Sequence, residues 1–145
     1  MATIFTIGYE RLLPPELVAE LEAAGVKRVV DVRFRPQSRR PGMSKTRLGQ
    51  LLGDHHIAYE HRRALGTPAD LRFLFHAGRI AEGAAAFRTH IEATASHELD
   101  TLAAELDHAP PTALLCLEAD PAVCHRRVLT EQLQARRRDL RVVDL

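Results

Sequence analysis

The chain has 145 residues, of which 46% are hydrophobic and 27% are charged, as in an ordinary globular protein. We expect one α/β domain over residues 1–145, because this length supports a single sizeable core. No apolar run approaches the roughly 20 residues that span a bilayer, so no membrane partner is expected. The net charge is +1, so the chain lacks the strong overall positive charge that is typical of many nucleic-acid-binding proteins. With two cysteines and no secretory pattern at the start, we expect free thiols and a cytoplasmic location.

The chain begins with a pattern of strand, helix and strand. Residues 3–8 (TIFTIG) are rich in β-forming residues, and residues 16–24 form an amphipathic helix. Residues 26–32 (VKRVVDV) are the next buried strand, which completes a right-handed βαβ unit. Ligands bind at the carboxyl ends of strands in parallel sheets. The candidate pocket residues at these two strand ends are therefore Gly8, Tyr9, Glu10 and Asp31.

A basic loop leaves the second strand. No acidic residue occurs between Asp31 and Asp54, and two prolines and a glycine mark the first part as a loop. Its basic residues are Arg33, Arg35, Arg39, Arg40, Lys45 and Arg47. Arg33, Ser38 and Arg39 are the candidate anion-binding residues, since guanidinium groups suit phosphate and carboxylate. The alternatives are a solvated charged loop and a structural Asp31–Arg33 pair.

A helix is expected next, with Ser44 as its N-cap. Residues 54–61 (DHHIAYEH) follow as a short strand or extended arm, in which Tyr59 is a candidate pocket residue. The three histidines of this arm do not have the spacing of a helical metal-binding pair, so no metal is predicted there.

The remaining middle part is expected to be helical and to cover the sheet. Helical patterns occupy residues 71–80 and 87–95, and Ser96 is expected to cap a third helix. Residues 141–145 (RVVDL) are expected to form the last strand.

The segment with the most chemically active residues is 112–133 (TALLCLEADPAVCHRRVLTEQL). Residues 113–117 are a short apolar run, typical of a strand buried on both faces, and Glu118 follows it. Asp120 and Pro121 predict a helix start, with Asp120 as N-cap and Pro121 at the first helical position. Cys124, His125 and Arg126 would then lie in the first two turns of this helix.

This position predicts a reactive cysteine. A helix N-terminus carries about half a positive elementary charge, which favours a thiolate, and nearby Arg126 adds to the effect. Cys124 is the candidate nucleophile, with Glu118 or His125 moving protons and Arg126 holding an anion. Cys116 belongs to the pocket wall and is interpreted as a small buried hydrophobe.

The same side chains suggest a metal site as an alternative. Thiolate, imidazole and carboxylate all suit zinc, and the residues concerned are Cys116, Glu118, Cys124 and His125. Their spacing, Cys-x7-Cys, is not that of a zinc finger. We therefore predict neither a metal nor another cofactor.

The alternation of strands and helices predicts a mainly parallel sheet of four or five strands with helices on both faces, a Rossmann-like sandwich. The chain contains no GxGxxG, P-loop or nucleophile-elbow motif, which removes the commonest nucleotide and esterase interpretations.

Four segments resemble the bacterial and archaeal family catalogued as domain of unknown function 488. They are TIGYE at residues 6–10, DVRFRPQSR at residues 31–39, YEHRRALG at residues 59–66 and LLCLEADPAVCHR at residues 114–126. The chain departs from the family pattern at Met43, where an aromatic residue is frequent, and at Thr67, where a second glycine usually follows. The resemblance supports the fold and the candidate residues and implies no reaction.

Three functions remain open. The first is an enzyme acting on a phosphate-bearing partner, a nucleotide or nucleic-acid component, held by Arg33, Arg39 and Arg126. The second is a non-catalytic nucleic-acid-binding module that uses loop 33–47, with binding that weakens steeply in salt. The third is a structural network of Asp31, Arg33, Glu118 and Arg126 without a ligand.

Overall fold

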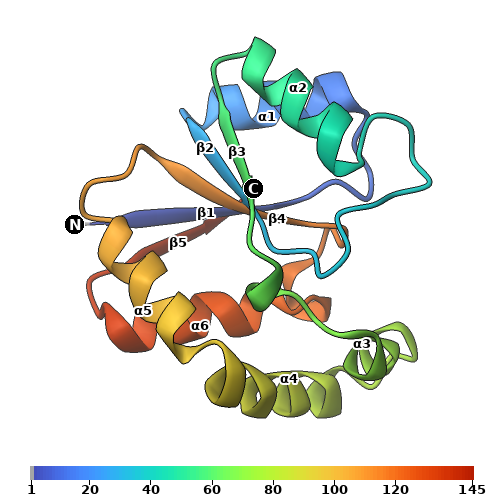
Figure 1. Ribbon diagram of the computed structural model, residues 1–145, viewed down its shortest axis with the longest axis vertical. Coiled ribbons are helices and arrows are strands. Elements are labelled where there is room, and N and C mark those ends of the chain that lie inside the picture. Colours follow the sequence, from blue (N-terminus) through green and yellow to red (C-terminus); the bar gives the residue numbers. More distant parts are fainter. Residues whose placement is uncertain (1) are drawn as a thin grey trace.

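Five strands form the central layer of the protein, whose computed structural model describes residues 2–145 (Figure 1). The strands are β1 (Thr3–Gly8), β2 (Arg28–Asp31), β3 (Ala58–His61), β4 (Thr112–Cys116) and β5 (Arg141–Asp144). Their order in the sheet is β3-β2-β4-β1-β5, and each neighbouring pair is parallel. The predicted fold class is confirmed.

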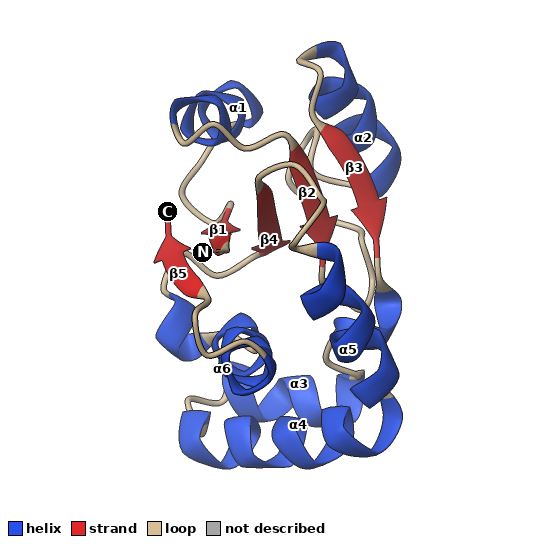
Figure 2. Cartoon of the chain, turned by 90° about the vertical axis from the view of Figure 1, so that its left-hand side faces the viewer, coloured by secondary structure: helices blue, strands red, loops and turns tan. Residues whose placement is uncertain are grey.

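Helices cover both faces of the sheet (Figures 1 and 2). One face carries α1 (Pro14–Ala23) and α2 (Lys45–Asp54), and the other carries α3 (Ala69–His76), α4 (Ile80–Thr94), α5 (Ser96–Glu105) and α6 (Arg126–Arg136). Each face has its own apolar core: Leu17, Leu21 and Leu48 pack on the first side, and Phe87 and Leu129 on the second. No helix within residues 2–145 is long and apolar enough to cross a membrane.

The pattern of burial follows strand order. All five residues of β4, in the middle of the sheet, are buried, whereas β3 and β5 at the edges are partly exposed. A strand packed on both faces needs apolar side chains in both directions, which explains the continuous apolar run of β4. The predicted strands are present, although β2 is shorter than the expected residues 26–32 and β3 occupies only Ala58–His61 of the expected residues 54–61.

The hydroxyl groups of two predicted serine caps form hydrogen bonds to other parts of the chain. Ser44 stands at the N-cap of α2, but its Oγ accepts a hydrogen bond from the backbone N–H of Ser38 at 3.0 Å. Ala95, not Ser96, is the N-cap of α5, and Ser96 Oγ accepts a hydrogen bond from Arg136 at 3.1 Å. In both cases tertiary contacts use the hydroxyl that the local pattern assigned to the helix.

The prediction that an α-helix begins at Pro121 is wrong, because α6 begins at Arg126. Asp120 does cap a turn, accepting the N–H of Ala122 at 2.9 Å, but the turn is a 3-10 helix over Pro121–Val123. The backbone of Cys124 is then extended, with φ −128° and ψ 149°, and α6 begins two residues later. Cys124 therefore lies in the connection before the helix.

Candidate functional site

A pocket opens at the carboxyl edge of the sheet, where the predicted motifs come together. It has an interior of about 40 Å³, lined by the segments after β1, β2 and β4, by residues 67–75 and by the connection before α6. A cavity needs roughly 10–15 Å³ to hold one water molecule, so the interior admits a group of only a few heavy atoms. Its lining includes Cys116, Glu118, Cys124 and His125, which lie in or follow the apolar run of residues 113–117.

The absence of a side chain at Gly8 allows the backbone at Glu118, after β4, to pack directly against the end of β1. A Cβ atom at Gly8 would lie 1.7 Å from the backbone oxygen of Glu118. Beyond Gly8 the chain continues along β4, because the Tyr9 N–H donates to the Cys116 carbonyl at 3.2 Å and the Glu10 N–H to the Leu117 carbonyl at 2.8 Å. Glu10 is exposed, and its carboxylate accepts the Ala119 N–H at 3.1 Å, which ties the two loops together.

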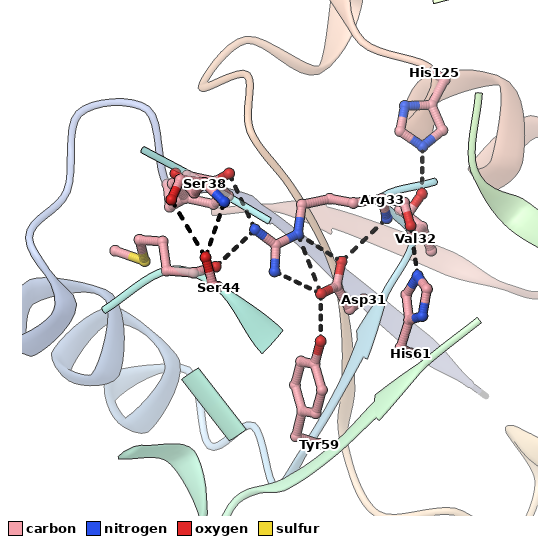
Figure 3. A network of polar contacts seen from close by, with 10 residues as sticks. Asp31, Val32, Arg33, Ser38, Ser44, Tyr59, His61 and His125 are labelled. Carbon is pink, nitrogen blue, oxygen red and sulfur yellow. Dashed lines mark hydrogen bonds and ion pairs between the residues drawn. The ribbon is translucent and has the colours of Figure 1, made fainter. Parts of the chain in front are cut away.

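Asp31 and Arg33 form a buried ion pair at the end of β2 (Figure 3). Arg33 Nε donates to one carboxylate oxygen at 2.9 Å and its NH2 to the other at 2.7 Å, so the contact is bidentate. The remaining terminal nitrogen donates to the Met43 carbonyl and to the Tyr9 hydroxyl. Tyr59 completes the network by donating its hydroxyl to Asp31. The structure therefore contains the Asp31–Arg33 ion pair that was predicted from the sequence as an alternative to anion binding.

This network fixes the charge states of its members. Burial lowers the pKa of Arg33, while the hydrogen bonds and the charge of Asp31 raise it by more, so Arg33 remains charged. Burial and the Asp31 carboxylate both raise the pKa of Tyr59, which keeps its hydroxyl a donor. Arg33 lines the pocket with its guanidinium already committed to Asp31, which reduces what it can offer to a ligand.

The other predicted anion-binding residues do not line this pocket. Ser38 and Arg39 line a different, open groove together with the rest of loop 36–47. Arg126 is completely buried beneath the connection before α6. Two of the predicted pocket residues, Tyr9 and Cys116, line the pocket. The other four do not line it: Gly8, Glu10, Asp31 and Tyr59.

His125 has a defined tautomer. Its Nε2 lies 2.8 Å from the Val32 carbonyl, while His61 Nε2 contacts the next carbonyl, that of Arg33, at 2.6 Å (Figure 3). A carbonyl can only accept, so the His125 proton is at Nε2 and Nδ1 carries the lone pair. That lone pair faces Cys124 Sγ at 3.6 Å, within reach of a thiol donor. The Cys124 sulfur, the His125 ring and the Val32 carbonyl are thus joined in series.

The thiol of Cys124 is protonated in this setting. Burial raises its pKa well above the ordinary value, and the neighbouring Cys116 raises it further, while Arg126 acts weakly the other way. The expected thiolate at a helix N-terminus is not supported, because Cys124 lies before the helix in an apolar, crowded position.

The pKa of His125 leads to a testable pH dependence. Burial lowers this pKa, and the hydrogen bond to Val32 only partly offsets it. Below about pH 6.5 the unfolded chain binds a proton that folded His125 does not, so the free energy of unfolding should fall as the pH drops, by at most about 1.4 kcal/mol per pH unit. Urea denaturation at a series of pH values measures this slope.

The control for this prediction is a second histidine. His125→Gln should flatten the slope below pH 6.5, whereas replacement of the exposed His97 with glutamine should leave it as in the wild type. Equal slopes for His125→Gln and the wild type would show that His125 is not the titrating group.

Three donor atoms suitable for a metal lie close together. The ligand atoms of Cys116, Glu118 and Cys124 are within 4.8 Å of one another. The Arg126 guanidinium, however, donates to Cys116 Sγ at 2.8 Å, and its positive charge disfavours a cation at the same sulfur. The charge arrangement suits an anion better than a metal.

Three further pocket residues were not among the predicted site residues. Arg35 and Arg72 are exposed arginines on the pocket wall, and Thr67 is 5% exposed. The Thr67 hydroxyl has no hydrogen-bond partner within residues 2–145. Arg72 lies on α3, whose helical pattern carried no chemical motif, and only the fold brings it to this edge. For Thr67 the departure from the family pattern was the available signal.

Comparison of the chain with known proteins identifies its family and nothing more specific. A family model described as Domain of unknown function DUF488 matches residues 14–133. The chain belongs to this family. The resemblance drawn from the four segments is thereby confirmed. No curated protein and no solved structure matches the chain.

In this DUF488 protein the matched region includes nearly all of the pocket. Arg33, Thr67, Arg72 and the Cys124–His125 pair fall inside residues 14–133, and Tyr9 precedes them. The family match therefore includes most of the site, but the family description gives no reaction.

Proposed function

We propose that the pocket binds a phosphate-bearing ligand, a nucleotide or a nucleic-acid component, and that the protein acts on it as a thiol-dependent enzyme. The observation that carries the proposal is the Thr67 hydroxyl, which is buried at the pocket without a partner in the described chain. An unpaired buried hydroxyl costs about 1–3 kcal/mol, a cost that a bound oxyanion would remove.

Charge supports the same proposal. Arg35 and Arg72 are exposed on the pocket wall and can each offer a guanidinium fork, whereas Glu118 is the acidic residue of that wall. Because the interior is only about 40 Å³, a phosphate group would enter and the rest of the ligand would lie outside. The sulfur groups and the His125 lone pair border the same space, which suits nucleophilic chemistry on that ligand.

The test is a calorimetric titration with inorganic phosphate and with nucleoside monophosphates. Arg72→Gln should weaken binding about tenfold or more, since a hydrogen bond to a charged group contributes about 1.5–3 kcal/mol. Thr67→Val, which keeps the shape and removes the hydroxyl, should weaken it about fivefold. Arg138→Gln is the matched control, because exposed Arg138 precedes β5 at the opposite edge of the sheet.

Two results would contradict the proposal. One is an absence of phosphate and nucleotide binding by the wild type. The other is equal affinity in the Arg72→Gln, Thr67→Val and Arg138→Gln variants. Either would favour the alternative in which the Asp31–Arg33 network is structural and no ligand is bound.

A second candidate function rests on the open groove of loop 36–47. The groove, of about 520 Å³, is lined by exposed Arg39, Lys45 and Arg47, which suits a nucleic-acid backbone. Arg40 is less available, because its guanidinium donates to the backbone carbonyls of Tyr9, Glu10 and Leu12. Oligonucleotide binding that weakens steeply with salt and is reduced by Arg47→Gln, but not by Arg72→Gln, would identify this function.

A further inference from the structure

Arg126 is a buried cation with an unusual set of partners. Its side chain is 0% exposed, and its guanidinium donates to the backbone carbonyls of Glu118 and Ala119 and to Cys116 Sγ, the last at 2.8 Å. None of these three partners is a carboxylate. Buried charges in proteins are normally paired, because removing a charge from water is costly. The Cys116 sulfur is the partner that can carry a full negative charge.

Cys124 has the opposite character. Its sulfur lies 3.6 Å from His125 Nδ1 and within 4.8 Å of Cys116 Sγ. Both cysteines line the pocket although each residue is at most 3% exposed. One sulfur is thus placed beside a cation and the other beside a base, which is the division of roles in a pair of attacking and resolving thiols.

We propose that Cys116 and Cys124 form a redox-active dithiol that is oxidised to a disulfide by a small hydroperoxide. The interior of about 40 Å³ has room for a molecule of the size of hydrogen peroxide. The inference concerns the two sulfurs and does not depend on phosphate binding by Arg35 and Arg72.

The chemistry proceeds in two steps. The Cys116 thiolate attacks one peroxide oxygen, so that an S–O bond forms and the O–O bond breaks; the departing hydroxide takes a proton from solvent and leaves as water. Cys124 then gives its proton to His125 Nδ1 and attacks the Cys116 sulfur. An S–S bond forms, the S–O bond breaks, and the departing hydroxide takes the proton from His125 as a second water. A small thiol would return the pair to its reduced state.

The experiment treats the reduced 145-residue chain with equimolar hydrogen peroxide at neutral pH, without phosphate. Free thiols are then alkylated, and intact mass and peptide mapping locate the products. The wild type should lose both alkylation sites and yield an intramolecular Cys116–Cys124 disulfide. Cys124→Ser should stop at a Cys116 sulfenic acid that dimedone traps, and Cys116→Ser should consume peroxide at least about tenfold more slowly.

Circular dichroism of both serine variants shows whether each retains the fold, and the wild-type mapping tests the proposal without any variant. The inference is overturned if the wild type forms only intermolecular disulfides, or if Cys124 is the sulfur that reacts first. It is also overturned if peroxide leaves both thiols free. Phosphate titration of the untreated wild type, run beside the peroxide mapping, separates the two proposals, because disulfide formation and phosphate binding can each be lost while the other is observed.

Discussion

Gly8→Ala should lower the free energy of unfolding by more than about 3 kcal/mol, or prevent folding. The new Cβ would stand 1.7 Å from the Glu118 backbone oxygen and 2.4 Å from its carbon. These are backbone atoms of a loop fixed by Arg126, which donates to the same Glu118 oxygen, so the neighbour cannot rotate aside. Urea denaturation monitored by circular dichroism measures the loss.

The matched control is Gly53→Ala. Gly53 lies within α2, and a Cβ there meets nothing within 4 Å. Alanine favours a helix over glycine, so the free energy of unfolding should stay constant or rise by up to about 1 kcal/mol. Similar stability changes for Gly8→Ala and Gly53→Ala would contradict the close approach of the two loops.

Asp31→Asn should cost about 3–5 kcal/mol of stability, because it leaves the buried Arg33 charge without its counter-ion. Asn is close to Asp in size, so the effect reports charge and hydrogen bonding more than packing. Chemical denaturation measures it. The control is Asp100→Asn, which breaks an ion pair with Arg136 in which the Asp100 side chain is 62% exposed. That change should stay within about 0.5 kcal/mol.

A double-mutant cycle tests the pairing directly. Arg33→Met should destabilise the wild type strongly and the Asp31→Asn variant much less, since the cation is then already unpaired. Additive effects of Asp31→Asn and Arg33→Met would mean that the two side chains act independently and that the network does not hold this edge.

Some of the site could be predicted because its residues occupy strand ends. Tyr9, Asp31 and Glu118 follow apolar runs, and parallel strands bring their carboxyl ends to one edge of a sheet. That is a property of the order of elements, so the gathering of the motifs near Cys124 was predictable without coordinates. Arg72 was not, because a residue on a covering helix reaches the pocket only through the packing of α3.

The roles of the charged groups were less predictable. Arg33 and Arg126 have the same local appearance as exposed anion-binding arginines, yet one is paired with Asp31 and the other is fully buried against Cys116. Whether an arginine faces solvent or a counter-ion depends on residues distant in the chain. Cys116 likewise looks like a core residue in the apolar run of β4, and only Arg126 distinguishes it from one.

The sequence by itself determined the alternation of strands and helices, the parallel sheet and the edge at which the site lies. Apolar periodicity, proline and glycine are local signals, and they act over the length of one element. The tertiary structure decided where α6 begins, which arginines remain free and which sulfur meets a cation. Cys124 illustrates the reason: the pattern around Asp120 and Pro121 favours a continuous helix, but the contacts of His125 with Val32 and of Arg126 with Cys116 accompany an extended connection there. Long-range contacts of buried polar groups outweigh a helix-start preference of about 1 kcal/mol.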